Sequence, residues 1–275
     1  PVERILTRSN GLRRRATGVE LADGTVVTAP IVVSNADPSK TYLEMVGRQY
    51  LGPVLRARLA KTPYSCSSVS LFFAAEIDAD EAGLDSGNYW YNRDADLEET
   101  YRIAAQGSVD DIARMHGLFL TVTSLKDRTK LKKPNLHTME AFSLVPYEPF
   151  AAWANTTVGE RPDAYEAVKA RITDAMLAAL DQRIPGLRER VVFAELGTPL
   201  SNEFYVNGTR GSMYGTTKTA GWIGPFAYGL TSPIDGLYLC GASTLGHGVA
   251  GSTASGVVAA TKILDAPMRE VLSGK

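Results

Sequence analysis

Short apolar runs separated by turn residues occupy the first part of the chain and predict a small antiparallel meander. Ala22-Asp23-Gly24 lies between two of these runs and is a strong hairpin signal. The last run passes into Ser34-Asn35-Ala36-Asp37-Pro38, a loop whose backbone polar groups can face a ligand. The strands that we expect here are residues 2–6, 17–21, 25–28 and 31–33.

Longer runs with more aromatic residues follow, and they predict a largely antiparallel sheet with one long helix. The apolar positions between residues 163 and 181 recur at helical spacing. Asp163 and Glu166 at the start of this helix predict a capping box. The expected strands of the sheet are residues 67–75, 88–92, 118–124, 136–145 and 191–196.

A stretch rich in Gly, Thr, Tyr and Trp, residues 201–233, predicts a long and weakly structured connection. From Gly236 the pattern changes to a strand, a glycine turn and a helix of small residues. The first and last segments of the chain are therefore expected to share a domain. The sequence predicts an α/β (α+β) protein, with one domain of residues 1–62 and 201–275 and a second domain of residues 63–200.

The composition is that of an ordinary globular protein and excludes several classes of function. The 275 residues are 44% hydrophobic and 21% charged, with a net charge of −1, so nothing attracts nucleic acid by charge. No apolar run approaches the roughly 18 residues of a membrane-spanning helix. Cys66 and Cys240 lie far apart in strand-like runs, which predicts buried free thiols and a reducing, cytoplasmic location.

The polar side chains single out no catalytic residue and no metal site. His116, His137 and His247 lack metal-ligand spacing, and a Gly-x-Ser-x-Gly motif is absent, which argues against a serine hydrolase. His247 is either an acid, base or electrostatic partner in a site, or a plain loop histidine. A set of aromatic residues either lines an apolar tunnel or belongs to an ordinary core: Tyr89, Trp90, Tyr91, Tyr214, Trp222 and Phe226.

The glycine turn near the C-terminus is the strongest functional signal. Gly246-x-Gly248-x-x-Gly251 matches GxGxxG formally, but only 24 residues follow it, so no Rossmann βαβ unit can follow. Backbone amides at a helix start without bulky side chains can nevertheless hold a flat anionic group. Tight packing of the helix on the strand is the alternative interpretation.

The residues around this turn resemble a known family. Leu237-Tyr238-Leu239-Cys240-Gly241-Ala242-Ser243-Thr244, followed by Gly248-Val249-Ala250-Gly251, resembles the C-terminal flavin-binding signature of the phytoene desaturase family, which includes carotenoid isomerases and retinol saturases. The opening of the chain is similar to the family's meander and return strand, at residues 2–5, 18–21 and 33–38. Residues 124–127, 137–139, 145–148 and 197–200 resemble its substrate domain.

The resemblance implies a set of FAD contacts. The backbone of Val2 would meet the adenine, and Asn35 with Ala36 would lie near the ribose and diphosphate. Gly241, Ala242 and Ser243 would meet the diphosphate and the ribityl chain. Gly248, Val249 and Ala250, with the helix start at Gly251 and Ser252, would hold the pyrimidine edge of the flavin. The chain departs from the family at Ala250, where proline is common, and at His247, which replaces a glycine.

The resemblance also implies the activity: FAD-dependent desaturation, saturation or isomerisation of a long apolar polyene by hydride exchange with flavin. The remainder of a Rossmann-like FAD-binding domain would accompany a substrate-binding domain. The basic loop of Lys126, Arg128, Lys130, Lys132 and Lys133 is either a solvated surface or a peripheral contact with anionic lipid.

No N-terminal glycine fingerprint is present, although relatives bind the ADP half of FAD with that segment. Either trimming of the chain removed the segment, or a second chain supplies this nucleotide-binding unit, or the chain holds no flavin. The alternative function is a non-catalytic fragment or subunit that binds a hydrophobic ligand or a partner chain.

Overall fold

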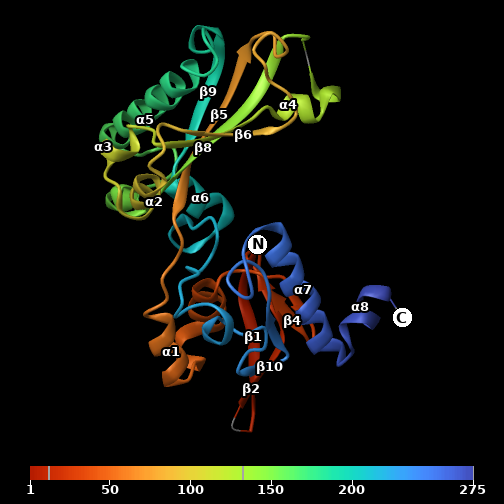
Figure 1. The fold of residues 1–275 in the computed structure, drawn as a ribbon. Helices are drawn as coiled ribbons and strands as arrows, with labels where there is room; N and C mark the ends of the chain where they lie inside the picture. The colour runs from red at the N-terminus through yellow and green to blue at the C-terminus, as the bar shows by residue number, and fades with distance from the viewer. Residues whose placement is uncertain (12, 132, 275) are drawn as a thin grey trace. The chain divides into compact units, whose positions relative to one another are not determined.

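The computed structural model describes residues 1–11, 13–131 and 133–274, and the chain forms two compact units (Figure 1). Unit 1 comprises residues 1–65 and 214–275, and unit 2 comprises residues 66–213. The sequence predicted one domain of residues 1–62 and 201–275 and a second of residues 63–200. Compared with the units in the structure, the first predicted boundary lies three residues earlier in the chain and the second lies thirteen residues earlier. The roles assigned to the two parts stay predictions.

Unit 1 contains a meander that the sequence predicted. Strands β1 (Val2–Asn10) and β2 (Arg13–Leu21) pair antiparallel, and β3 (Val26–Thr28) pairs with β2. The two-residue strand β10 (Ile234–Asp235) adds to β2 in parallel. Gly18 has a φ of 148° and lies against the Val27 carbonyl, so only glycine fits this irregular point of the β1–β2 register.

A second, parallel pair in unit 1 joins segments from the two ends of the chain. Strand β4 (Val32–Ser34) pairs with β11 (Leu237–Leu239). Helices α1 (Pro53–Leu59), α7 (Gly248–Leu264) and α8 (Met268–Ser273) belong to the same unit, with a π-helix at Lys40–Gly47 and 3-10 helices at Arg48–Tyr50 and Gly224–Phe226. The buried core of unit 1 is Ile5, Ala16, Tyr42, Val46, Leu51, Leu59, Tyr228, Ile234, Leu237 and Leu239.

Unit 2 contains the antiparallel sheet expected from the sequence. Its strand order is β6-β7-β8-β5-β9, and every neighbouring pair is antiparallel. The strands are β5 (Ser67–Glu76), β6 (Asn88–Asn92), β7 (Gly117–Thr121), β8 (Leu136–Val145) and β9 (Val191–Gly197). The prediction of a strand through residue 124 is wrong, because helix α4 (Thr123–Lys126) begins there and Ser124 Oγ accepts a hydrogen bond from the Thr138 amide.

The long helix α5 (Asp163–Asp181) has the predicted bounds and buries Tyr165, Ile172, Met176 and Leu180. The predicted capping box is wrong. Pro162 is the N-cap residue and makes no side-chain cap, because Asp163 and Glu166 both lie inside the first turn. There the two carboxylates still face the positive end of the helix dipole.

Helix α6 (Pro199–Val206) occupies part of the stretch expected to be weakly structured, so that expectation is wrong for residues 201–206. The helix begins in a capping box in which the Thr198 amide donates to Ser201 Oγ, and Pro199 lies at its first position. The remaining short 3-10 helices of unit 2 are Arg128–Lys130, Glu148–Trp153, Arg188–Arg190 and Thr209–Gly211.

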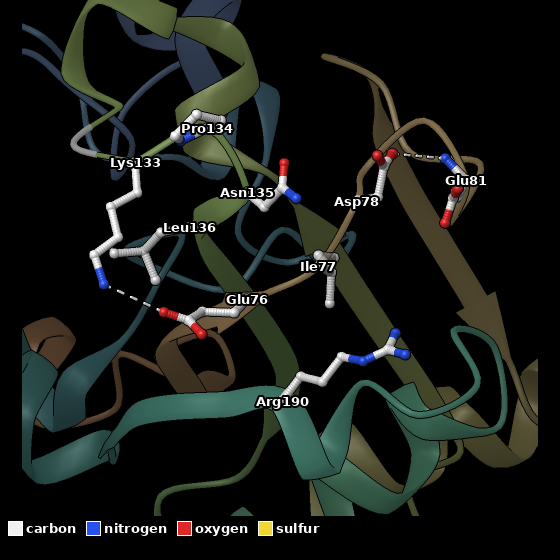
Figure 2. A pocket seen from close by; sticks show the side chains of 9 residues that line it. All are labelled: Glu76, Ile77, Asp78, Glu81, Lys133, Pro134, Asn135, Leu136 and Arg190. Carbon is white, nitrogen blue, oxygen red and sulfur yellow. Dashed lines mark hydrogen bonds and ion pairs between the residues drawn. The ribbon is translucent and has the colours of Figure 1, made fainter.

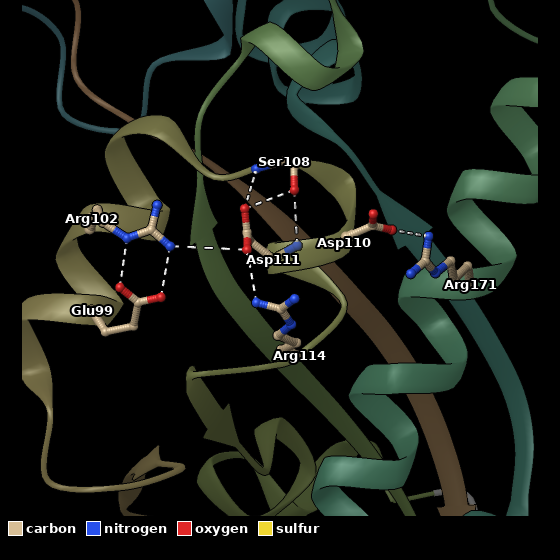
Figure 3. A network of polar contacts seen from close by, with 7 residues as sticks. All are labelled: Glu99, Arg102, Ser108, Asp110, Asp111, Arg114 and Arg171. Carbon is tan, nitrogen blue, oxygen red and sulfur yellow. Dashed lines mark hydrogen bonds and ion pairs between the residues drawn. The ribbon is translucent and has the colours of Figure 1, made fainter.

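Helices α2 (Leu97–Gln106) and α3 (Val109–Ile112) are fixed by a network of charged groups (Figure 3). Ser108 and Asp111 form a capping box at the start of α3, and Arg102 of α2 lies 4.0 Å from the same carboxylate. Asp110 pairs with Arg171 at 2.6 Å and so ties α3 to α5. The network therefore connects α2 with α3 and α3 with α5.

Cys66 and Cys240 are both half-buried, so the expectation of buried thiols is wrong. Burial raises the pKa of Cys66 and of Cys240. Among the described residues, no helix combines the length and apolar character that crossing a bilayer requires.

His137 is a buried histidine at the start of β8, and its Nδ1 lies 3.0 Å from Ser124 Oγ. Burial and the nearby Arg128 lower the pKa of His137, against a smaller opposing effect of Asp78 and Asp80. The folded protein therefore favours the neutral imidazole.

We expect the free energy of unfolding to fall as the pH is lowered from about 7.5 to about 5.5. The unfolded chain takes up a proton near the ordinary histidine pKa of about 6.5, whereas the folded chain resists it until lower pH. The stabilisation by neutral His137 is therefore present above about pH 6.5 and is lost below it. Urea unfolding at the two pH values measures this effect. His137→Gln should weaken the pH dependence, and an unchanged dependence in this variant contradicts the assignment.

Candidate cofactor-binding site

The glycine turn lies at the carboxyl ends of the parallel strands β4 and β11. The Cys240 amide donates to the Ser34 carbonyl at 3.0 Å. Gly241 has a φ of 88°, and a Cβ at this position would lie 3.2 Å from the Asn35 carbonyl oxygen. Asn35 and Gly241, which are 206 residues apart in the sequence, are therefore brought together. In open α/β sheets, ligands bind beyond this end of the strands.

Hydrogen bonds within the protein fix the first residues of the turn. The Gly241 amide donates to Ser255 Oγ at 2.7 Å, and this hydroxyl donates to the Ser252 carbonyl at 2.6 Å. Thr244 Oγ1 donates to the Gly241 carbonyl at 2.8 Å. The Gly241 amide therefore already donates its hydrogen bond to a residue of α7. Gly241 can still serve a ligand site, because the absence of a side chain lets a ligand come close to its backbone. No sequence pattern singles out Ser255.

Ser243 is 5% exposed and its side chain is used to position the turn. Its Oγ accepts a hydrogen bond from the Thr216 amide at 3.2 Å, and Thr216 Oγ1 donates to the Ser243 carbonyl at the same distance. Gly215 lies so close that a side chain there would collide with Ser243 Oγ. The half-buried Ala242 lies between these anchored residues.

The start of α7 is accessible, whereas the residues of the turn are held by hydrogen bonds within the protein. His247 is its N-cap residue and makes no side-chain cap. Gly248 has a φ of 71° and nothing within 4 Å of a Cβ, while Val249 is 87% exposed and Ala250 is exposed. The amides of a 17-residue helix therefore begin with no capping side chain, at the positive end of the helix dipole.

Gly251, one turn into the helix, has a packing role. A Cβ there would lie 2.5 Å from the Gly246 carbonyl carbon. The two interpretations of the GxGxxG pattern therefore apply to different glycines: close packing at Gly251 and an open position at Gly248. Ser252, which follows Gly251, is half-buried.

One further residue near the turn, Lys218, was missed from the sequence. Lys218 is half-buried and its Nζ donates to the Thr244 carbonyl at 3.2 Å, and among the described residues no carboxylate lies within ion-pair distance of it. Burial lowers the pKa of Lys218. The ring of Tyr214 lies 4.8 Å from that of His247. A lone lysine in a glycine-rich stretch carries no signal in the sequence.

The predicted adenine and ribose contacts lie at the strand ends of unit 1. Val2 is partly exposed at the start of β1, in the other sheet of this unit. Asn35 is exposed directly after β4, and the Ala36 carbonyl accepts a hydrogen bond from Thr41 Oγ1 at 3.2 Å. Of these three residues, Asn35 lies against the glycine turn, and the roles of Val2, Asn35 and Ala36 in binding FAD all stay predictions.

A cavity of about 430 Å³ in unit 2 has a different chemistry (Figure 2). Its lining is strongly charged, and Lys133 forms an ion pair with Glu76 at 3.5 Å. Asp78, Glu81 and Arg190 also face it. Such a lining does not suit a long apolar molecule. No group of three or more His, Cys, Asp or Glu in the described part of the chain could hold a metal ion.

Solved structures with a similar fold are oxidoreductases. An oxidoreductase from Methanosarcina mazei matches 96% of this chain and 48% of its own, with a TM-score of 0.56 and 16% identity. A variant of putrescine oxidase redesigned in cofactor binding matches to the same extent, with the same TM-score and identity. At this identity the likeness establishes the fold, and the fold class expected from the sequence is confirmed.

Curated proteins with similar sequences give a second comparison. All-trans-retinol 13,14-reductase of Danio rerio is 27% identical over 277 residues, covering 96% of this chain and 45% of the relative. Prolycopene isomerase of Arabidopsis thaliana is 29% identical, covering 90% and 39%. Phytoene desaturase of Rhodobacter capsulatus is 28% identical, covering 98% and 49%.

The resemblance inferred from the motifs is confirmed, because these relatives are the retinol reductases, carotenoid isomerases and phytoene desaturases that the motifs indicated. No family profile matches the chain. The chain spans about half the length, or less, of the curated relatives it matches.

Proposed function

We propose that this chain is part of an FAD-dependent oxidoreductase that desaturates, saturates or isomerises a long apolar polyene. The observation that carries the proposal is the meeting of two parallel strand ends with the uncapped start of α7, across a turn whose sequence resembles the flavin-binding signature of the phytoene desaturase family. Bound FAD supplies the hydride chemistry, and the protein supplies binding, orientation and electrostatics.

The residues at the turn fit the flavin end of FAD. Gly248 leaves open space beside the helix start, so a flat ring can approach the backbone amides. Lys218 and the helix dipole both favour negative charge at this place, which suits the pyrimidine edge of a reduced flavin. Asn35 and Gly241 would admit the diphosphate and ribityl chain through close backbone approach.

The substrate class rests on the relatives and on unit 2. The relatives are named for retinol, prolycopene and phytoene, which are lipophilic polyenes. One face of the sheet in unit 2 carries neighbouring aromatic rings suited to such a molecule. A peripheral membrane contact through the basic loop would bring the protein to a lipophilic substrate. That contact and a cytoplasmic location stay predictions, and Lys132 lies outside the described residues.

The free edge of β4 supports a nucleotide-binding unit beside this chain. Among the described strands, β4 pairs only with β11, and Val33 and Ile31 are 48% and 42% exposed. Parallel strands are normally buried within larger sheets. We therefore infer that further parallel strands, in this protein or in a second chain, pair with β4 and hold the ADP half of FAD.

FAD titration tests the site. We expect Lys218→Met to lower the affinity for FAD about tenfold, because a charged hydrogen-bond donor near an anionic group contributes about 1.5 kcal/mol or more. Quenching of flavin fluorescence on binding gives the dissociation constant. Lys262→Met, at an exposed lysine near the end of α7, is the matched control and should bind as the wild type does.

The same titration is repeated with the nucleotide-binding segment of a relative co-expressed. Flavin colour that co-purifies with the completed protein supports the proposal. A completed protein that stays colourless and does not quench flavin contradicts it, and favours the alternative of a non-catalytic subunit.

A further inference from the structure

Another cavity of unit 2, of about 420 Å³, lies between α5 and the ends of α3 and β6. It forms because α5 presents small side chains there: Ala175, Ala178 and Ala179 recur at helical spacing and share one face of the helix. The buried residues Met115 and Leu118 complete the apolar part of the lining. The volume lies in the range of small-molecule binding sites.

The polar part of this lining is basic. Arg93, Arg114 and Arg183 line the cavity, and none of its described lining residues is an Asp or a Glu. Arg114 pairs with Asp111 at 3.1 Å (Figure 3). Arg183 Nη2 donates to the Asn92 carbonyl at 3.1 Å, which uses one of its five N–H groups. The side chain of Arg93 has no partner among the described residues, so two guanidinium groups of the lining carry no counter-charge.

The cavity of Figure 2 shows that this charge is not a general property of unit 2. Its volume is nearly the same, about 430 Å³, but three carboxylates line it together with Lys133 and Arg190. Near the basic cavity, the C-terminal end of α5 adds about half a negative charge, which is less than two guanidinium groups supply. Electrostatics therefore favours an anion in the basic cavity and not in the other.

The residues beside the arginines favour an anion with an organic body. A phosphate monoester carries close to two negative charges at neutral pH, and guanidinium groups bind phosphate through paired N–H···O bonds. Tyr91 also lines the cavity, with the Arg183 guanidinium 5.6 Å from the centre of its ring. A single inorganic ion would leave this ring and the alanine face of α5 in contact with water only. A compact apolar or planar group attached to the phosphate would cover them.

We propose that this cavity binds an organic phosphate, a phosphate monoester with a compact apolar or planar body. Arg93 and Arg183 hold the phosphate, and Tyr91 with the alanine face of α5 contacts the body. The inference goes beyond the proposed redox function, because all the lining residues belong to unit 2 and the binding needs no flavin.

Calorimetric titration with phenyl phosphate tests the proposal. We expect saturable binding by the wild type, about tenfold weaker binding of inorganic phosphate, which lacks the ring, and no measurable binding of benzyl alcohol, which lacks the phosphate. Arg93→Met should lower the affinity for phenyl phosphate about tenfold or more, because a charged hydrogen-bonding group is lost. Arg93→Lys keeps the charge without the planar fork and should lie between the two. The matched control is Arg190→Met, at an exposed arginine of the other cavity, which should bind as the wild type does.

Two further measurements separate binding from folding and from the cofactor turn. Arg93→Met should unfold at the same urea concentration as the wild type, because its side chain has no partner to lose. In the wild type, the guanidinium ¹⁵N signals of Arg93 and Arg183 should shift with phenyl phosphate. Lys218→Met should leave this binding unchanged, since Lys218 belongs to unit 1. Unaltered affinity in Arg93→Met, loss of affinity in Lys218→Met, or equal affinity of the wild type for inorganic phosphate overturns the proposal.

Vesicles distinguish the two sources of such a phosphate, a free small molecule and a lipid headgroup. We expect the free molecule, because the cavity has room for its body as well as for the phosphate. The protein should then bind phenyl phosphate and not sediment with phosphatidylcholine vesicles that contain phosphatidic acid. Sedimentation that phenyl phosphate reverses and Arg93→Met abolishes supports the same phosphate site and assigns its ligand to the lipid.

Discussion

Gly251→Val is expected to lower the free energy of unfolding of unit 1 by about 2 kcal/mol and to weaken FAD binding more than about tenfold. Replacing a helical glycine gains at most about 1 kcal/mol of helix propensity. Against this gain, the new Cβ would lie 2.5 Å from the carbonyl carbon of Gly246 and 2.9 Å from its Cα. Both neighbours are backbone atoms that cannot rotate away, so the turn must move from the helix.

Because the turn moves, we expect Gly251→Val to reduce the affinity for FAD more strongly than the free energy of unfolding. In the proposed site, the hydrogen bond from the Gly241 amide to Ser255 Oγ holds the turn against α7. Urea unfolding and FAD titration measure the two effects separately. Gly256→Ala, in the same helix with nothing within 4 Å of its Cβ, is the control and should stabilise the protein by up to about 1 kcal/mol. Normal FAD affinity in Gly251→Val would show that the turn does not form the site.

The elements that could be predicted from the sequence are those with strong periodic patterns. β6, β8 and α5 have the expected bounds, because alternating or helical apolar positions run through their full length. The glycine turn was also visible, since glycines between an apolar strand and a helix are rare without a reason. Asn35 could be proposed only through the family resemblance, and the structure places it against Gly241.

The residues that could not be predicted act through contacts between distant parts of the chain. In the sequence, Ser255 and Lys218 look like any helix serine and loop lysine. Only the folded structure shows that Ser255 accepts a hydrogen bond from the Gly241 amide and that Lys218 donates one to the Thr244 carbonyl. The capping box at Asp163 failed for a local reason, since Pro162 takes the cap position. Short helices such as α2 have too few apolar positions for a periodic signal.

Leu71→Ala is expected to lower the free energy of unfolding of unit 2 by about 3 kcal/mol, within the usual range for removing a buried leucine. Leu71 is fully buried on β5, which pairs with both β8 and β9. The variant should also destabilise unit 1, although the two buried clusters are separate. The reason is the chain connection, because unit 2 is inserted between Ser65 and Tyr214.

Folded unit 2 keeps the two ends of this insertion together, since the Met213 amide donates to the Cys66 carbonyl at 3.0 Å. Once unit 2 unfolds, unit 1 must close a loop of about 150 residues, at an entropic cost on the order of 4 kcal/mol. With Trp90→Phe and Trp153→Phe as background, Trp222 reports unit 1 alone, and its transition should shift to lower urea in Leu71→Ala. Leu97→Ala removes the same atoms from a half-exposed position and should leave both units nearly unchanged. A Trp222 transition that does not move in Leu71→Ala would show that unit 1 folds independently of its insertion.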